Sequence, residues 1–497
     1  MTLLQPELLT ELAATFPDGV AWRNAADGSS MTLGQWHAGS NRLARGLGQH
    51  GVAPGDRVAL LIGEDEPLEW LTSYMAIHRA GAVAVPLLAR LGAGEVARIL
   101  RHAGARLALC SDATDALRDS VPGVVSTAGS GAGSWRALWS PDGSDLPVAL
   151  DPDDAADVMY TSGTTGAPKG VIVRHGGLAT VDRVPEHWLG LGFLTSSPFA
   201  TTSGSLLVCG PLRGGLSGCF LPRFDPERWI STVERDRPVA GFLVPAMVEL
   251  LVASPRFAAA DLSSLAVVNV GSAPIAPATL QRFGAGLGRG EVLCGYGMTE
   301  YGAVTAMPMG DRGRHAGSVG RPLPDVVVRI VDAQGAELPA GEVGQVAIRE
   351  GPCPRSYLDD DARNAQTRAD GWLLSGDLGH VDDDGFLWVV GRQKEMVIRG
   401  GHNIVPGEVE AALFDHPAVV EAAVAGLPHP VLGEDIAAWV VLREPADPEA
   451  LRVFLLERLA DYKVPRRITV LDVLPRNESG KVLKSQLVQE AELRSAP

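Results

Sequence analysis

Residues 160–171 read Y-T-S-G-T-T-G-A-P-K-G-V, a short stretch that combines hydroxyl side chains, glycines and a lysine. Gly163 and Gly166 let the backbone approach a ligand closely and adopt positive φ. Successive backbone N–H groups in such a turn form a concave anion site, and Lys169 adds a positive charge on a flexible stem. The stretch therefore predicts a loop that binds a triphosphate. Its hydroxyl donors are Thr161, Ser162, Thr164 and Thr165.

The flanks of this loop separate it from the P-loop of NTPases. A P-loop reads G-x-x-x-x-G-K followed by Ser or Thr and opens a helix. Here Pro168 precedes Lys169 and Gly170 follows it. Residues 157–160 and 171–173 are expected to be short strands, so the loop joins strand to strand. The remaining alternative is a polar hairpin without a ligand, and the placement of Lys169 argues against it.

Lysine is scarce in this chain, which contains five lysines among 43 basic residues. Three of them, Lys169, Lys394 and Lys481, lie in glycine-containing motifs. This placement points to all three as functional. Lys463, in Tyr-Lys-Val-Pro, is expected to be structural, and Lys484 is expected to be solvated.

The composition bounds the class of protein. A chain of 497 residues predicts two or three domains. A net charge of −16 without a basic run argues against a nucleic-acid partner. The first residues lack a signal-peptide pattern, and no apolar run approaches the ~18 residues that a membrane span needs. Five scattered cysteines are typical of a reducing compartment, so a cytoplasmic location is expected.

The first part of the chain alternates between helix and strand patterns. Thr32 and Gln35 predict a capping box for a helix that ends near Gly51. Strands separated by helices indicate a parallel, doubly wound sheet. The expected strands are 57–62, 82–87, 106–110, 206–212, 241–244 and 266–270, and the expected helices include 67–79 and 94–102.

The pattern changes after residue 317. Strands are expected at 326–331, 344–349 and 385–390, then a helix at 407–414, strands at 419–424 and 436–441, and a helix at 448–459. The predicted fold is α/β. Residues 1–391 form a large N-terminal domain of doubly wound mixed sheets plus a β-rich subdomain, and residues 395–497 form a small α+β domain.

Five more motifs follow the first loop, and their order carries a resemblance. They are Gly271–Pro274, Gly295–Glu300, Ser375–Asp377, Gly391–Lys394 with Arg399–Gly401, and Pro475–Lys481. In this order they resemble the adenylate-forming superfamily along roughly residues 10–490. That superfamily comprises acyl- and aryl-CoA synthetases, adenylation domains of nonribosomal peptide synthetases, and beetle luciferase. It implies a large N-terminal domain and a small mobile C-terminal lid.

The resemblance implies a role for each motif. ATP phosphates would be bound by Thr161, Ser162, Gly163, Thr164, Thr165, Gly166 and Lys169. Adenine would be held by Gly271, Ser272, Ala273, Pro274 and Tyr296, within an AMP-binding set that includes Gly295, Gly297 and Met298. Thr299 would bond the α-phosphate, and Glu300 would bind Mg²⁺, which prefers carboxylate and phosphate oxygens. Asp377 would accept the ribose hydroxyls, with Arg392 nearby.

The resemblance also implies a reaction in two steps. Lys481 would reach the carboxylate and the α-phosphate while an acid and ATP form acyl-AMP and pyrophosphate. The lid would then turn about Lys394, within a hinge near 392–394. This turn would bring Gly400 and Gly401 to the path of the pantetheine arm of CoA, whose thiol takes the acyl group.

The acid itself is less well defined. Amino-acid-activating relatives pair the α-ammonium with an aspartate, but residues 197–204 carry no carboxylate. Since an unpaired buried ammonium is costly, amino acids are disfavoured. Where many CoA ligases carry a histidine after the phenylalanine, this chain has Ala200 and Thr201, which departs from the usual gate. The expected pocket walls are Phe199, Thr201, Val244, Met247, Val270 and Gly271.

Aryl, fatty and branched acids stay open, as does the oligomeric state. CoA is favoured as the thiol acceptor because no insertion typical of carrier-protein-loading ligases is visible. The alternative is an enzyme that loads a non-amino acid onto the phosphopantetheine of a carrier protein. A luciferase-type oxygenase and a nucleotide-binding protein without catalysis are further alternatives, and the intact motifs argue against the latter.

Overall fold

The computed structural model describes residues 3–128, 134–147, 149–161, 169–178, 183–311, 313–476 and 482–495. The chain divides into two compact units, and each is described by itself. Unit 1 comprises Met1–Ser272, Gly286–Val304 and Glu350–Gly371, and unit 2 comprises Ala273–Ala285, Thr305–Arg349 and Trp372–Pro497.

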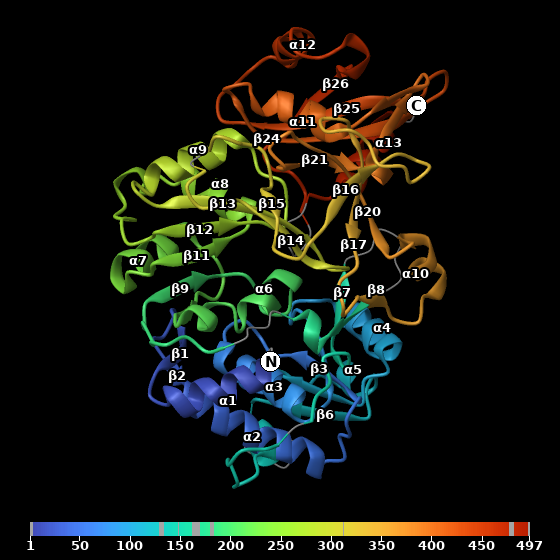
Figure 1. Ribbon diagram of the computed structural model, residues 1–497. Coiled ribbons are helices and arrows are strands. Elements are labelled where there is room, and N and C mark those ends of the chain that lie inside the picture. The colour runs from blue at the N-terminus through green and yellow to red at the C-terminus, as the bar shows by residue number, and fades with distance from the viewer. Residues whose placement is uncertain are drawn as a thin grey trace. The chain divides into compact units, whose positions relative to one another are not determined.

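Unit 1 is built from alternating strands and helices (Figure 1). Its strands are β1 (Val20–Asn24), β2 (Ser30–Thr32), β3 (Arg57–Leu61), β4 (Val83–Pro86), β5 (Leu107–Cys110), β6 (Gly123–Ser126), β7 (Ala155–Thr161), β8 (Lys169–Arg174), β9 (Gly192–Thr195), β10 (Ser217–Phe220), β11 (Ala240–Leu243), β12 (Val267–Val270), β13 (Glu291–Met298), β18 (Ser356–Tyr357) and β19 (Arg368–Ala369), and β14 (Gly302–Ala306) begins there. Its helices are α1 (Gln5–Thr15), α2 (Leu33–Gln49), α3 (Pro67–Arg79), α4 (Ala93–Ala103), α5 (Asp115–Arg118), α6 (Thr202–Leu207), α7 (Pro226–Asp236), α8 (Pro245–Ala253) and α10 (Asp361–Thr367).

Two mixed sheets organise unit 1. One has the strand order β18-β8-β7-β4-β3-β5-β6, and the second runs β13-β12-β11-β9-β10-β1-β2 within this unit. Strands β9 to β13 pair in parallel, whereas β7 and β8 pair antiparallel. The expected mixed α/β architecture is confirmed.

Strand β3 shows why these sheets are covered on both faces. Successive side chains of a strand point to opposite sides. Val58 and Leu60 are buried in one cluster with helices α1, α2 and α3, while Ala59 and Leu61 are buried in another with α4. Helix α3 contacts β3 and β4 of one sheet and β1 of the other (Figure 1). A strand buried on both faces reads as a continuous apolar run, as residues 57–62 do.

The capping box of α2 is formed as predicted. Thr32 Oγ1 accepts the Gln35 backbone N–H at 3.2 Å, and Gln35 Oε1 accepts the Thr32 backbone N–H at 2.9 Å. These bonds satisfy two backbone donors that the first helical turn leaves without partners.

The strand expected at 206–212 is wrong. The segment holds the end of α6 and the start of the 3-10 turn η3 (Pro211–Gly214). Thr201 caps α6 by accepting the Gly204 backbone N–H at 3.1 Å. Val208, Cys209 and Leu212 are fully buried. A short apolar run that is buried on all sides has the same sequence pattern in a helix as in a strand. Here the N-cap at Thr201 starts a helix.

Unit 2 holds two further sheets. Its strands are β15 (Arg321–Pro322), β16 (Val328–Val331), β17 (Gly344–Arg349), β20 (Trp372–Val381), β21 (Leu387–Arg392), β22 (Val397–Arg399), β23 (His402–Ile404), β24 (Val419–His429), β25 (Gly433–Leu442) and β26 (Arg467–Val470). Its helices are α9 (Pro277–Gly286), α11 (Pro406–Phe414), α12 (Pro448–Leu456) and α13 (Lys484–Ser495). The β-rich stretches and the later α+β elements are confirmed, with α12 ending before the expected residue 459.

The sheets of unit 2 differ in their packing. The first pairs β16, β17, β20 and β21 antiparallel. The second has the order β23-β22-β25-β24, with β26 beside β25, and packs α11 and α12 over a core that includes Val409, Leu413, Ile436 and Leu451. Among the described helices, none combines the length and the apolar character that a membrane crossing requires.

Candidate active site

Four of the predicted segments follow neighbouring parallel strands at one edge of a sheet in unit 1. The registers align Thr195 with Phe242, Leu243 with Val270, and Val270 with Cys294. Residues 196–201, Val244, 271–272 and 295–300 therefore come after the carboxyl ends of β9, β11, β12 and at the end of β13. Ligands of open α/β sheets bind outside this edge, so the sheet brings the predicted adenine, α-phosphate and acid segments to one place.

Two backbone features mark this edge. Ser272, exposed after β12, has a φ of 78°, a region that residues other than glycine rarely adopt. Such strain concentrates at ligand-binding positions. Gly297 lies against the chain that follows it, since a Cβ there would come within 2.5 Å of the Gly302 carbonyl oxygen. The turn that carries Thr299 and Glu300 therefore needs glycine at this position.

The predicted triphosphate loop sits on an antiparallel hairpin. β7 ends and β8 begins with the pair Thr161 and Lys169, which confirms that the loop joins strand to strand. Lys169 is half-buried. Residues 162–168, which include Ser162, Gly163, Thr164, Thr165 and Gly166, lie outside the described residues.

Tyr357 connects this hairpin to the Gly295–Glu300 motif. Its strand β18 pairs with β8, with Tyr357 opposite Val171. The Tyr357 hydroxyl donates to Glu300 Oε1 at 2.7 Å. Burial, with the Glu300 charge added, raises the pKa of Tyr357 well above its ordinary value. The phenol therefore stays protonated at neutral pH and always offers a donor to the carboxylate.

Arg355 makes a second connection. It is 4% exposed, and it donates from Nη1 to the Thr299 carbonyl at 2.8 Å and from Nη2 to the Gly177 carbonyl at 3.2 Å. Gly177 lies in the 3-10 turn directly after β8. Burial lowers the pKa of Arg355 to about 10, opposed by the charge of Asp157. At neutral pH the guanidinium stays charged and ties the two segments together.

Arg355 is also influenced by the charge of a buried carboxylate, Asp157. Asp157 of β7 is fully buried and accepts the Tyr74 hydroxyl at 2.8 Å, and its other oxygen lies 3.0 Å from His78 Nε2. The rings of His175 and His78 pack edge to face, with their centroids 5.0 Å apart. Burial, with His78 adding to it, lowers the pKa of His175 to about 3. His175 is therefore neutral at neutral pH, and the charge of Asp157 counters the effect of burial on the pKa of Arg355.

Thr299 is held on its side chain as well. Its hydroxyl lies 2.8 Å from that of Thr202, in the first turn of α6. The acid segment after β9 and the α-phosphate motif after β13 are thereby joined. Thr202, Arg355 and Tyr357 were not predicted, because a two-residue strand and a lone threonine carry no periodic signal.

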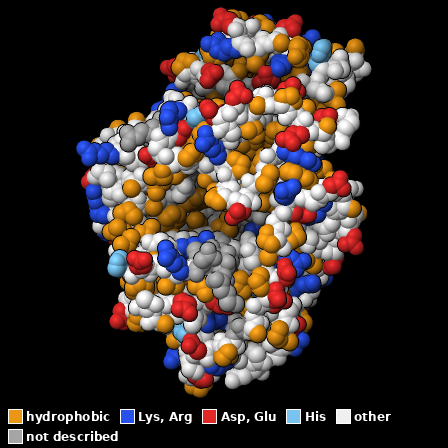
Figure 2. Space-filling view, in the orientation of Figure 1, with side chains coloured by type: hydrophobic (Ala, Val, Ile, Leu, Met, Phe, Trp, Pro, Cys, Tyr) orange, Lys and Arg blue, Asp and Glu red, His pale blue; other side chains and the backbone are white. Residues whose placement is uncertain are grey.

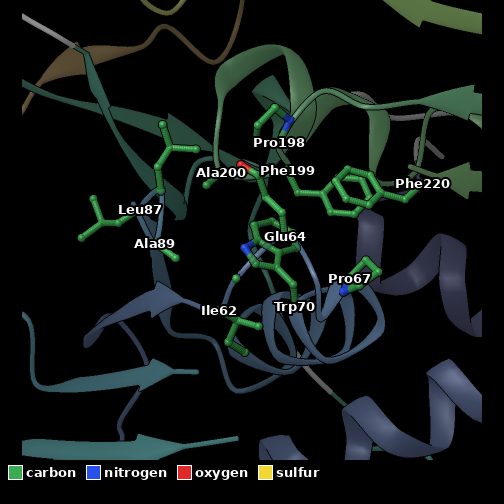
Figure 3. A pocket seen from close by; sticks show the side chains of 12 residues that line it. Ile62, Glu64, Pro67, Trp70, Leu87, Ala89, Pro198, Phe199, Ala200 and Phe220 are labelled. Atoms are coloured by element: carbon green, nitrogen blue, oxygen red, sulfur yellow. The ribbon is translucent and has the colours of Figure 1, made fainter. Parts of the chain in front are cut away.

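The predicted acid-pocket residues fall into two groups. Phe199 is buried and lines a cavity of about 20 Å³, enough for one water molecule, with Trp70 and Phe220. Its ring lies 4.6 Å from that of Phe220 and 5.3 Å from that of Trp70 (Figure 3). Glu64 also lines the cavity, and burial raises its pKa.

The other group lies at the sheet edge. Val244 and Met247 follow β11, Val270 ends β12 and Gly271 follows it, and none of the four lines the Phe199 cavity. Figure 2 shows hydrophobic side chains gathered over the part of unit 1 that contains these strands. Thr201 caps α6, and its place in a pocket wall is not tested by this contact. The acid pocket therefore stays a prediction.

Unit 2 carries the predicted ribose residues. Asp377 of β20 and Arg392 of β21 are register partners, and Arg392 Nε lies 3.1 Å from Asp377 Oδ1. Asp377 is 5% exposed, whereas the Arg392 side chain is 54% exposed. A buried carboxylate beside an accessible guanidinium fits a hydroxyl ligand with an adjacent anion. Exposed Ala273 and Pro274 also belong to unit 2.

The predicted hinge and pantetheine residues also lie in unit 2. Lys394 lies in the 3-10 turn η5 (Gln393–Glu395). Gly400 and Gly401 form the two-residue turn between β22 and β23, with φ of 57° and 86°. Positive φ at both positions fits a type I′ hairpin turn. The turn by itself therefore explains why glycine occupies these two positions. Lys481 lies outside the described residues.

Comparisons with known proteins decide the family. The model of the AMP-binding enzyme family matches residues 9–358, and that of the AMP-binding enzyme C-terminal domain matches residues 408–481. The chain belongs to the AMP-binding enzyme family. It is an ATP-dependent, AMP-forming acid–thiol ligase of the adenylate-forming superfamily, as the order of the motifs implied.

Individual relatives of this AMP-binding enzyme are similar along nearly its whole length. A feruloyl-CoA synthase of Amycolatopsis sp is 37% identical over 93% of this chain and 94% of the relative. A fatty acid–[acyl-carrier-protein] ligase, ScoC of Streptomyces coeruleorubidus, is 32% identical over 93% and 92%. The crystal structure of ATP-bound MatB from Rhodopseudomonas palustris is 30% identical over 98% and 99%, with a TM-score of 0.88.

The carboxylate of Glu300 fits a magnesium ion that is shared with a nucleotide. Within the described ranges, no group of three or more His, Cys, Asp or Glu side chains could hold a metal by itself. Mg²⁺ at nucleotide sites needs only one or two carboxylates together with phosphate oxygens. Glu300 uses Oε1 to accept from Tyr357 and is only half-buried, so it suits such a shared site.

We expect Tyr357→Phe to raise the Mg²⁺ concentration for half-maximal pyrophosphate release by about 10-fold or more, the usual cost of losing a group that orients a metal ligand. The phenol no longer fixes the carboxylate of Glu300. Glu300→Gln should raise the requirement further, since it removes the charge that the ion binds. The measurement is a Mg²⁺ titration of each variant at saturating ATP.

The double variant provides the control. If Tyr357 acts through Glu300, Tyr357→Phe should change the titration little in the Glu300→Gln background. Unchanged titrations of both single variants would show that the ion is held elsewhere.

Proposed function

We propose that this enzyme activates a non-amino, apolar carboxylic acid with ATP to an acyl-adenylate and then transfers the acyl group to the thiol of CoA. The observation that carries the proposal is the sheet edge of unit 1. There the ends of β9, β11, β12 and β13 gather the predicted acid, adenine and α-phosphate segments. Tyr357 and Arg355 fasten this edge to the hairpin that bears Lys169.

In the first step, a carboxylate oxygen attacks the α-phosphorus of ATP. A carbon–oxygen–phosphorus linkage forms, the bond to the β-phosphate breaks, and pyrophosphate leaves. Two anions must meet, so positive charge has to be placed in advance. We assign this to Lys169, to the donors of residues 161–166 and to Lys481, with Thr299 on the α-phosphate. When bound at Glu300, Mg²⁺ supplies further positive charge to the phosphate oxygens.

The nucleoside is assigned to two sets of residues, one for the base and one for the ribose. Tyr296 and residues 271–274 would hold the adenine, since an aromatic ring stacks well on a base. Asp377 would accept the ribose hydroxyls, and Arg392, which pairs with it at 3.1 Å, would orient that carboxylate.

In the second step, the thiolate of CoA attacks the carbonyl carbon of the mixed anhydride. A thioester forms, the carbon–oxygen bond to AMP breaks, and AMP leaves with the electron pair. We place a rotation about Lys394 between the steps, so that Lys481 withdraws and the Gly400–Gly401 turn arrives. Such gating is common in enzymes that run two reactions in one site.

The acid class is argued from the sheet edge. Residues 197–204 offer no carboxylate to pair an ammonium group. Val244 and Met247 after β11 and Val270 at the end of β12 provide apolar side chains. The similarity to a feruloyl-CoA synthase, at 37% identity, supports an aryl acid as the first substrate to try.

A carrier protein is the second candidate acceptor. One observation favours it: a ligase named for fatty acids and the acyl carrier protein is 32% identical over most of both chains. The chemistry of the thiol is the same, because a carrier protein presents the same phosphopantetheine arm.

A panel of aryl, fatty and branched acids tests both the proposed acid class and the proposed acceptor. Pyrophosphate release is measured for each acid, with CoA, with a phosphopantetheine-bearing carrier protein, and with neither. We expect release with an aryl acid and a CoA thioester as product. Loading of the carrier protein without any CoA thioester would reverse the acceptor, and no release with any acid would refute the proposed activation.

A further inference from the structure

The residues on either side of positions 477–481 pair with each other, and Arg476 also contacts the second sheet of unit 2. Arg476 and Val482 form an isolated antiparallel bridge, and the Leu483 backbone N–H donates to the Pro475 carbonyl at 2.8 Å. Arg476 Nη2 lies 2.8 Å from Glu421 Oε2 on β24. Residues 477–481 themselves lie outside the described part of the chain.

Lys484 makes the strongest of these attachments. It is the first residue of α13, and its Nζ lies 2.8 Å from Glu410 Oε1 and 3.0 Å from Glu395 Oε2. Glu410 belongs to α11, and its Oε1 also accepts the Val424 backbone N–H of β24 at 2.7 Å. The side chain of Lys484 is 24% exposed and that of Glu410 is 19% exposed. Lys484 is therefore paired and mostly covered, which corrects the expectation of a solvated lysine.

The electrostatics favour one arrangement of these groups. Burial lowers the pKa of Lys484, but the charges of Glu410 and Glu395 outweigh it, and the pKa is raised from its ordinary value. Lys484 is thus an ammonium between two carboxylates. Removing it would leave two mostly covered carboxylates facing each other, a costly state that is relieved when the groups move apart.

Glu395 places the cluster of Lys484, Glu395 and Glu410 next to the predicted hinge. Glu395 ends the turn η5 and directly follows Lys394, the predicted pivot of the lid. Lys484 follows Lys481 by three residues, a length of chain that spans at most about 11 Å. The Lys484–Glu395 ion pair thus connects the residue after Lys394 with a residue three positions after Lys481.

We propose that Lys484 is a positioning residue that ties the hinge turn to the start of α13, three residues after Lys481, and so helps to place Lys481 for adenylation. This inference rests on the proposed function. It predicts that the loss of Lys484 damages adenylation, which needs Lys481 in place, and leaves thioester formation nearly unchanged.

Lys463 offers a matched control in the same sheet system. Its Nζ lies 2.6 Å from Glu408 Oε1, and the two side chains are 21% and 41% exposed, close to the values of the Lys484–Glu395 pair. Lys463 lies in the turn η6 (Asp461–Lys463) and its partner on α11. This pair touches neither η5 nor α13, so its loss should cost stability alone.

The experiment measures both half-reactions in the full-length enzyme. Pyrophosphate release reports adenylation, and synthetic acyl-adenylate with CoA reports transfer. Lys484→Met should lower the first by about 10- to 100-fold, the scale for a misplaced catalytic group, and change the second less than about 2-fold. Glu395→Gln should also lower the rate of adenylation. Lys484→Arg, which keeps the charge, should recover most of the rate.

Thermal unfolding separates positioning from folding. Lys484→Met and Lys463→Met should lower Tm by similar amounts, but only Lys484→Met should change the ratio of the half-reactions. Equal loss of both half-reactions, or an effect no larger than that of Lys463→Met, overturns the inference while leaving the proposed function intact. Failure of the wild-type enzyme to release pyrophosphate with any acid overturns the proposed function, and the inference with it.

Discussion

Lys481→Ala should lower acyl-adenylate formation by roughly 10²–10³-fold, the scale for losing one preorganised charge stabiliser. The reacting carboxylate and the α-phosphate are both anions, and Lys481 is the cation assigned to both of them, whereas Lys169 and Mg²⁺ are assigned to the phosphates. Transfer from synthetic acyl-adenylate to the thiol should be spared, since the lid has by then withdrawn the lysine. The measurement compares pyrophosphate release with thioester formation in the same preparation.

Two further variants support this assignment. Lys481→Arg keeps the charge but changes its geometry, since a planar guanidinium replaces a compact ammonium, and it should recover only part of the rate. Lys463→Ala removes a lysine whose partner is Glu408, and it should leave the ratio of the half-reactions unchanged. Equal damage to both half-reactions by Lys481→Ala would refute a role confined to adenylation.

Gly401→Leu should have the opposite signature: adenylation persists, acyl-adenylate accumulates, and little acyl-CoA forms. A Cβ at this position meets no other atom within 4 Å, so the added side chain projects into open space. In the thioester-forming arrangement that space is the proposed path of pantetheine, and a close-packed tunnel does not absorb a leucine cheaply.

The φ of 86° at Gly401 requires a control. Any side chain there adds left-handed strain of about 1–2 kcal/mol, which would lower stability whatever the path of CoA. Asparagine tolerates this conformation better and is smaller. Gly401→Asn should therefore form thioester faster than Gly401→Leu. If the two variants lose stability and both half-reactions in proportion, the glycines serve the turn and the pantetheine path lies elsewhere.

Most of the motifs proposed to carry the chemistry could be read from local sequence. Each is a short run whose residue types have a chemical reason to be neighbours, such as glycines with hydroxyls and Lys169, or Thr299 beside Glu300. The capping box at Thr32 is readable for the same reason, since helix capping acts over a few residues. The short apolar runs at 57–62 and 206–212 carry no alternation, because each is buried on all sides, and local sequence alone does not tell strand from helix there. The first is a strand and the second is not.

The sequence by itself determined the order of the motifs, the alternating helices and strands, and through them the family. Only the tertiary structure decided which residues hold those motifs in place. Tyr357 lies 57 residues from Glu300, Arg355 lies 56 from Thr299, and Lys484 lies 89 from Glu395. The reason is physical: a motif reflects chemistry between chain neighbours, whereas a supporting hydrogen bond or ion pair requires only that two side chains meet after folding.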